Sequence, residues 1–314
     1  MVTRRLVIKP VYGLGNRMMA MASAARLARR LDCELAVEWT VLYDMATPFT
    51  DLFETEGVTL VSEADTAGYP HYDLAGSGGV LIDAEDVRRH EVVKITACSI
   101  FYMADDPMDP SRLVFGANAF YQDAAFAVGD CLRALRPAAE ICDRLARIGA
   151  DRFAGAIGVH MRHHDRVDDG WVGSFTDIDR QTWRSLCWSL MSHFPDRDVF
   201  LSSNSQEDYD FFDQVGEGRV FYHAKTSLDR AERDSQKEAL VDMLLLARTS
   251  LLVRHGGSTF AYVPGLAYRV PQLVVRGQGD QVESILCDVE TPSGDPVFTL
   301  RSAAYVAEVL NRAS

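Results

Sequence analysis

Short apolar runs alternate with segments of helical periodicity along most of this 314-residue chain, and this alternation constrains the fold more than any other feature. In the second half, Ala156–Val159 and Asp198–Ser202 are apolar runs of strand length. Between them, Asp179–Phe194 repeats its apolar residues with the period of a helix. A chain that alternates in this way is expected to form mainly parallel sheets with helices packed on their faces.

The same criteria give a full series of expected elements. We predict strands at Leu6–Lys9, Glu34–Trp39, Val58–Val61, Gly79–Ile82, Val92–Ala97, Ala156–Val159, Asp198–Ser202, Arg219–His223, Ser250–Val253 and Gln272–Val275. We predict helices at Met18–Leu31, Ala117–Ala134, Pro137–Gly149, Asp179–Phe194, Gln206–Val215, Glu232–Arg248, Ser258–Leu266 and Ala303–Arg312. Gly129 is expected to interrupt the second of these helices.

The length and the two alternating blocks predict two α/β domains, since one domain holds roughly 100–200 residues. We place the first domain at residues 1–150 and the second at residues 151–314. In open α/β sheets, ligands bind beyond the carboxyl ends of the strands. Polar residues that follow a predicted strand are therefore the candidate functional residues.

Composition narrows the possible ligands and location. The 32 basic and 45 acidic residues give a formal net charge of −13, which disfavours binding to nucleic acid. No run of about 18 uninterrupted apolar residues occurs, so we expect no membrane span. The six cysteines lack the spacing of a metal site, and the N-terminus lacks the apolar core of a signal peptide. These features predict a cytoplasmic protein with reduced thiols.

The first candidate motif connects the first predicted strand to the first helix and consists of Gly13, Leu14, Gly15, Asn16 and Arg17. Glycines allow the backbone to approach a ligand, and the helix start presents N–H groups to it. An arginine at a helix N-terminus opposes the helix dipole, which suggests that Arg17 serves a ligand or partner. The alternative is a tight turn in which Asn16 caps the helix.

The second motif is a polar cluster that follows the strand Ala156–Val159 and contains His160, Arg162, His163, His164 and Asp165. Such polarity at the end of a buried strand is costly unless solvent, pairing or a ligand satisfies it. The planar guanidinium of Arg162 suits bidentate phosphate binding. His163, His164 and Asp165 are alternative general bases. A surface loop with an Arg–Asp pair is the structural alternative.

Two further polar positions fit either a ligand or a structural role. Asp242 lies in a helix that is apolar nearly all round, so its carboxylate needs hydrogen-bond donors from a ligand or from the protein. Asn204 belongs to a polar run, Ser202–Ser205, that closes a predicted strand. This run could contact a nucleotide base or ribose, or cap the following helix.

The segment Arg254–Phe260 has the composition of an anion-binding turn. A strand ends there in Gly256 and Gly257, and Ser258 or Thr259 opens the next helix. Backbone N–H groups, hydroxyls and a helix dipole bind oxyanions together. A plain strand-to-helix turn with a serine cap is the alternative.

In their order along the chain, these motifs resemble those of the fucosyltransferase superfamily. Gly13–Arg17, with the Ala/Met-rich helix after it, resembles the opening of that superfamily. Gly158–Arg162 resembles its H-x-R motif at a strand end, and Val241–Arg248 resembles its third motif. The chain is most similar to the nodulation-protein and core α1,6-fucosyltransferase families, although the resemblance is patchy over Thr40–Gly149.

The resemblance implies a GT-B fold, in which two Rossmann-like domains with mainly parallel sheets face a cleft. It implies an inverting, metal-independent glycosyltransferase that needs no cofactor. The donor would be a GDP-sugar carrying fucose or a related hexose, bound by residues 151–314. Residues 1–150 would form the acceptor side, and the acceptor would be a hydroxyl of a small molecule or glycan.

Carried over residue by residue, the resemblance implies that Arg162 holds the β-phosphate while His160 supports the nucleotide. Asp242 would contact the guanine. The helix start at Gly257, Ser258 and Thr259 would bind the diphosphate. The residues lining the cleft from the N-terminal side would be Gly13, Gly15, Asn16 and Arg17.

The chain departs from the core α1,6 enzymes at two places. They have a second arginine where this chain has His163, and paired acids where it has Asn204 and Ser205. A donor that carries a hexose other than fucose on GDP is therefore also compatible with the sequence. Two other functions stay open: a non-catalytic nucleotide- or glycan-binding protein on the same fold, and a phosphatase-like hydrolase that uses the cluster from His160 to Asp165.

Overall fold

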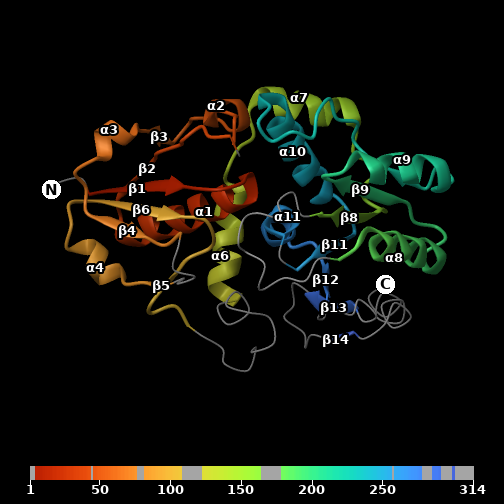
Figure 1. Cartoon of the computed structure of the whole chain (residues 1–314). Coiled ribbons are helices and arrows are strands. Elements are labelled where there is room, and N and C mark those ends of the chain that lie inside the picture. The colour runs from red at the N-terminus through yellow and green to blue at the C-terminus, as the bar shows by residue number, and fades with distance from the viewer. Residues whose placement is uncertain are drawn as a thin grey trace. The chain divides into compact units, whose positions relative to one another are not determined.

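The computed structural model describes residues 4–43, 45–75, 81–107, 122–163, 178–256, 258–277, 285–290 and 299–300 (Figure 1). The chain divides into two compact units. Unit 1 comprises Met1–Asp143, Asp229–Leu240 and Leu266–Tyr268, and unit 2 comprises Arg144–Leu228, Val241–Gly265 and Arg269–Ser314. Each unit contains its own α/β sheet.

Among the described residues, unit 1 holds a parallel sheet with the strand order β3-β2-β1-β6-β4. Its strands are β1 (Arg5–Pro10), β2 (Glu34–Val37), β3 (Thr59–Leu60), β4 (His71–Asp73) and β6 (Val92–Ala97). A separate parallel pair consists of β5 (Leu81–Ile82) and β7 (Tyr102–Met103). The central strand β1 is apolar and fully buried at Leu6, Val7 and Ile8, as a strand with neighbours on both sides must be.

Unit 1 also contains helices that precede or follow these strands. They are α1 (Leu14–Leu31), α2 (Phe49–Leu52), α3 (Glu63–Thr66), α4 (Ala84–Arg88), α6 (Gln122–Arg133) and the start of α7 (Ala139–Ile148). The Ala/Met-rich helix α1 packs on β1 and on α6, and the two helices lie side by side in Figure 1. Small alanine side chains permit this close packing.

Unit 2 holds a sheet with the strand order β10-β9-β8-β11-β12-β13-β14 among the described residues. Its strands are β8 (Ile157–Met161), β9 (Val199–Ser203), β10 (Val220–Phe221), β11 (Leu251–His255), β12 (Gln272–Gly277), β13 (Ile285–Glu290) and β14 (Thr299–Leu300). Pairing is parallel from β10 to β12 and antiparallel at β13 and β14. The helices are α8 (Arg180–His193), α9 (Gln206–Val215), α10 (Arg233–Leu246) and α11 (Thr259–Tyr268), of which α10 begins and α11 ends in unit 1.

The mainly parallel α/β architecture predicted from the sequence is confirmed, and most elements lie within a few residues of their predicted ends. The predicted interruption at Gly129 is wrong, because α6 runs through it. A Cβ at Gly129 would lie 2.7 Å from the backbone oxygen of Leu266, so this glycine permits the close approach of another segment. The predicted helix Ala303–Arg312 lies outside the described residues. No helix in the described ranges has the length and apolar character needed to cross a membrane.

Candidate functional site

The three central strands of unit 2 end at one edge of the sheet, which we call the carboxyl edge. β8 lies between β9 and β11, and His160 on β8 is in register with Ser202 on one side and Arg254 on the other. All residues of these three strands are buried, so each strand delivers its polar side chains only at its end. The described candidates that end or follow these strands, His160, Arg162, His163, Asn204 and Ser258, therefore lie at the carboxyl edge.

His160 joins the end of β8 to the start of α11. Its ring is 5% exposed and stacks on Phe260, with ring centres 4.7 Å apart and an angle of 17° between the planes. Nδ1 lies 3.3 Å from the hydroxyl oxygen of Ser258. Burial, followed by the positive charge of Arg162, lowers the pKa of His160 to about 3. The imidazole is therefore neutral at neutral pH.

The start of α11 opens at the carboxyl edge. Ser258 occupies the N-cap position, but its side chain makes no capping hydrogen bond and instead faces His160. The helix begins at Thr259, which is partly exposed, whereas Gly257 lies outside the described residues. The first N–H groups of a helix lack partners within it and favour an anion.

The two arginines at the carboxyl edge have different surroundings. Arg254 is buried, donates from Nε to Gln272 Oε1, and places its guanidinium carbon 4.9 Å from the ring centre of Tyr262. It therefore braces β11 against β12 and α11. Arg162 directly follows β8, is only partly buried, and acts electrostatically on His160.

Asp242 lies on α10 and is the centre of a buried polar network. Its side chain is 1% exposed; Oδ2 accepts a hydrogen bond from Ser202 at 2.7 Å and lies 2.8 Å from Lys225 Nζ. His223 Nδ1 lies 3.2 Å from Oδ1. Burial raises the pKa of Asp242, but the charge of Lys225 and the hydrogen bond from His223 outweigh it, and the pKa is lowered overall. Three protein groups thus occupy most of the roughly four acceptor positions of the carboxylate.

Asn204 and His163 form a second connection at the carboxyl edge. The backbone N–H of His163 donates to Asn204 Oδ1 at 2.9 Å, and Asn204 Nδ2 donates to the His163 carbonyl at 2.9 Å. The His163 ring contacts Asp208 on α9, with Nε2 at 2.6 Å from Oδ2. The other two candidate bases, His164 and Asp165, lie outside the described residues.

Sequence reasoning missed Asp208, His223 and Lys225. Asp208 lies in the first turn of α9, where acidic residues are common for helix-dipole reasons alone. His223 and Lys225 follow the two-residue strand β10, which ends at the same edge as β9. Their position after a strand that ends at this edge was the one feature of the sequence that could have predicted them.

In unit 1, Arg17 has a structural role. Its side chain is 0% exposed, Nε donates to the Tyr12 carbonyl at 2.7 Å, and one terminal nitrogen donates to the Thr40 carbonyl at 2.7 Å. The guanidinium carbon lies 4.7 Å from the ring centre of Trp39. Carbonyl oxygens and an aromatic face therefore compensate the positive charge of Arg17 at the helix N-terminus.

The other residues of this motif leave room around the backbone. Gly13 is the N-cap of α1 without a side-chain bond, and a Cβ there would meet nothing within 4 Å. Gly15 is buried in the first turn, and Asn16 lies inside the helix rather than capping it. Within the described part of the chain, the buried Oδ1 of Asn16 has no hydrogen-bond partner.

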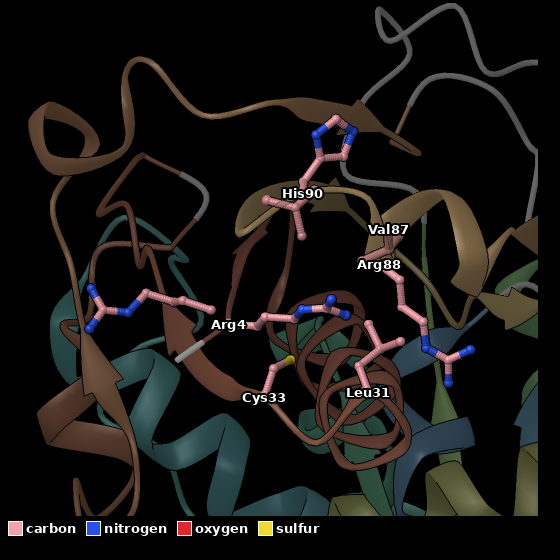
Figure 2. Close-up of a pocket in the computed structure, with 8 residues that line it drawn as sticks. Arg4, Leu31, Cys33, Val87, Arg88 and His90 are labelled. Atoms are coloured by element: carbon pink, nitrogen blue, oxygen red, sulfur yellow. The ribbon is translucent and has the colours of Figure 1, made fainter. Parts of the chain in front are cut away.

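A small pocket lies at the opposite edge of the unit 1 sheet, where β1, β2 and β6 begin (Figure 2). It is lined by Arg4, Arg5, Leu31, Cys33, Val87, Arg88, His90 and Val93. Arg5 pairs with Glu34 at 2.8 Å and Arg88 pairs with Glu85, so acidic neighbours already compensate two of its charges. Since ligands of such sheets bind at the carboxyl ends, this pocket is not a candidate active site.

No protein-family model matches the chain, and no curated protein sequence matches it. Solved structures do match. NodZ α-1,6-fucosyltransferase soaked with GDP-fucose superposes with a TM-score of 0.56 at 18% identity, covering 96% of this chain and 99% of that chain. Fucosyltransferase NodZ from Bradyrhizobium gives 0.54 at 18% identity, with 95% and 99% covered.

Two other fucosyltransferase structures are also similar. A variant of FUT1 from Arabidopsis thaliana in complex with GDP gives a TM-score of 0.57 at 17% identity, covering 88% of this chain and 71% of that chain. POFUT1 in complex with GDP-fucose gives 0.55 at 12% identity, covering 86% and 98%. The chain therefore has the GT-B fold of these fucosyltransferase structures, which confirms the predicted fold class.

Proposed function

We propose that the chain is an inverting glycosyltransferase that moves a hexose, fucose or a related sugar, from a GDP-sugar to an acceptor hydroxyl. One arrangement carries the proposal: Arg162 follows β8 at the edge where Ser258 precedes the N-terminus of α11, with the neutral ring of His160 beside both. A guanidinium and a helix N-terminus at one strand edge suit a diphosphate.

The shared fold supports the choice of donor. NodZ structures of this fold were obtained with GDP-fucose and with GDP, and POFUT1 was obtained with GDP-fucose. Under the proposal, unit 2 binds the GDP-sugar and unit 1 provides the acceptor side. Gly13, Gly15 and Asn16 then line the donor cleft from the N-terminal side, and the buried Arg17 supports this turn.

These groups would catalyse transfer by stabilising the negative charge that develops on the leaving GDP. As the bond between the anomeric carbon and the diphosphate breaks, negative charge grows on the departing GDP. Arg162 and the N–H groups near Ser258 and Thr259 stabilise that charge without reorganising. Removing one such preorganised donor typically lowers the rate by about 10²–10³-fold. Because His160 is neutral, it supports Ser258 without adding charge.

The remaining candidate residues are assigned to the nucleoside. Asp242 has about one acceptor position left beside its three protein partners, and we assign that position to the guanine. Asn204 holds the His163 backbone through both amide atoms, and any ribose contact would be additional to this role.

Two measurements test the proposal. In a thermal-shift assay, GDP at about 100 times its Kd stabilises the native state by about 2.7 kcal/mol, whereas UDP and ADP leave the melting temperature unchanged. Donor hydrolysis and transfer are then measured with GDP-fucose and other GDP-hexoses for the parent and for Arg162→Ala. The control is Arg248→Ala, at an exposed arginine of unit 2.

Arg162→Ala is expected to lose transfer while keeping its fold, and Arg248→Ala to behave as the parent. Transfer by Arg162→Ala at the parent rate would contradict the proposal. A melting-temperature rise with GDP but no turnover of any GDP-hexose would indicate the alternative, a non-catalytic nucleotide-binding protein on the same fold.

A further inference from the structure

We infer that Asp208 is a positioning residue that orients His163 as the general base for the acceptor hydroxyl. The inference rests on the proposed transferase function and names the base, which the sequence left open among three residues. It is carried by two independent features: how the His163 backbone is held, and what its ring contacts.

The His163 backbone is fixed beyond the end of β8. Asn204, just past the end of β9, accepts from the His163 N–H and donates to its carbonyl, both at 2.9 Å. A side-chain amide thus continues the ladder between the two strands where backbone pairing has ended. His163 therefore has the restricted position that a catalytic group requires.

The His163 ring is oriented by a buried carboxylate. Nε2 lies 2.6 Å from Asp208 Oδ2, and Asp208 is 0% exposed. Burial raises the pKa of Asp208, but hydrogen bonds from His163 and Ser203 outweigh it, so the pKa is lowered and the group stays ionised. An ionised carboxylate can only accept, so the proton must be on Nε2. In this tautomer the lone pair is on Nδ1.

Two cations also lie close to the other carboxylate oxygen of Asp208. Arg180 Nε and Arg184, both on α8, lie 3.2 Å and 3.9 Å from Asp208 Oδ1. These two arginines already compensate the carboxylate. Asp208 on α9 therefore faces His163 through one carboxylate oxygen and the α8 residues Arg180 and Arg184 through the other.

His163 is also better placed than the other described histidines at the carboxyl edge, of which His255, at the end of β11, is buried and 5% exposed. The side chain of His163 is 18% exposed, so part of it reaches solvent. His160 is buried, stacked and very weakly basic. His223 lies 3.2 Å from Asp242, so its carboxylate is farther away than Asp208 is from His163, at 2.6 Å.

The proposed step balances in atoms and charge. The acceptor oxygen bonds to the anomeric carbon while its proton moves to His163 Nδ1. The bond between the anomeric carbon and the diphosphate oxygen breaks, and its electron pair leaves with GDP. Asp208 stabilises the imidazolium, which then releases its proton to water.

The test measures the pH dependence of transfer in variants and, separately, which ring nitrogen of His163 carries the proton. His163→Gln is expected to lower kcat by about 10²-fold or more and to abolish the acid limb of the pH–rate profile. Asp208→Asn is expected to lower kcat and shift that limb to lower pH, because the imidazolium loses its counter-charge. The matched control is Glu207→Gln, one residue earlier on α9 and paired with Arg180, which should leave the profile unchanged.

Two readouts remain informative if Asp208→Asn is poorly folded. Nitrogen NMR of the parent should show His163 protonated on Nε2, and imidazole added to His163→Ala should restore transfer. A proton on Nδ1, or no rescue by imidazole, would overturn the inference. An unchanged acid limb in folded Asp208→Asn would also overturn it. These failures leave GDP-sugar turnover by the parent intact, whereas absence of that turnover removes the proposed function itself.

Discussion

Lys225 Nζ lies 2.8 Å from Asp242 Oδ2 inside unit 2, and both side chains are buried. Burial lowers the pKa of Lys225, yet the charge of Asp242 outweighs it and raises the pKa overall. Both groups therefore stay charged at neutral pH. The pair connects the segment after β10 to α10, and Ser202 connects it to β9.

Lys225→Met is expected to destabilise the protein. The substitution leaves the Asp242 carboxylate buried without its cation, and breaking a buried pair from one side typically costs about 3–5 kcal/mol. Urea unfolding followed by circular dichroism measures the loss. The control Arg248→Met changes an exposed cation of the same unit and should stay within about 0.5 kcal/mol of the parent.

A double variant separates charge from packing in this pair. Lys225→Met combined with Asp242→Leu removes both charges, and it should recover part of the stability lost in the single variant. If the double variant is as unstable as the sum of the two single variants, the charges do not interact strongly and the pair is not the reason for the loss.

The depressed pKa of His160 makes stability depend on pH in a defined window. In the unfolded chain a histidine titrates near 6.5, whereas the pKa of His160 in the fold is about 3. The contribution of His160 to the free energy of unfolding is fully present above about pH 6.5. It is lost as the pH falls toward 3, because the unfolded chain takes up a proton on this histidine while the folded chain does not. The expected slope approaches about 1.4 kcal/mol per pH unit.

Urea unfolding between pH 6.5 and 4.5 tests this dependence, since carboxylates titrate mainly below that range. His160→Gln should flatten the slope, whatever its effect on absolute stability. His71→Gln, at an exposed histidine of unit 1, should retain the parent slope. A parent slope that is unchanged in His160→Gln would show that His160 is not protonated on unfolding in this window.

The sequence predicted the fold well because the decisive signals are local. β6 and α9 occupy their predicted residues, since apolar period and flanking turn residues determine such elements. The prediction at Gly129 was wrong because glycine has a low helix propensity, which favours a break. In the structure the helix continues, and glycine is needed there because the Leu266 backbone lies too close for a side chain. That contact joins residues far apart in sequence, so no local pattern reveals it.

The polar contacts were less predictable because they also join residues that are far apart in the sequence. Asp242 stood out because it interrupts an apolar helix, but its partners Lys225 and His223 come from an irregular segment. His163 was predicted from its position after a strand, while Asp208 resembled an ordinary acid of a first helical turn. Strand ends predict where polar groups gather, but not which of them pair.

Arg17→Met tests whether the buried guanidinium stabilises unit 1. The change leaves the carbonyls of Tyr12 and Thr40 without their charged donor, and each such hydrogen bond contributes about 1.5–3 kcal/mol. We expect a clear loss of stability in urea unfolding. Arg17→Lys should recover little, because an ammonium lacks the planar fork that reaches both carbonyls and stacks on Trp39. Parent-like stability of both variants would favour a pure ligand role.

A pair of glycine substitutions separates ligand approach from packing in unit 1. Gly13 has an ordinary negative φ, and a Cβ there meets nothing within 4 Å, so Gly13→Ala should keep or slightly raise the melting temperature. Gly129→Ala places a Cβ 2.7 Å from the Leu266 oxygen and should destabilise by about 1–3 kcal/mol. If Gly13 lies against a substrate, Gly13→Ala should lower transfer at unchanged stability. Unchanged transfer would remove Gly13 from the candidate site, because the added methyl group would then meet neither protein nor substrate.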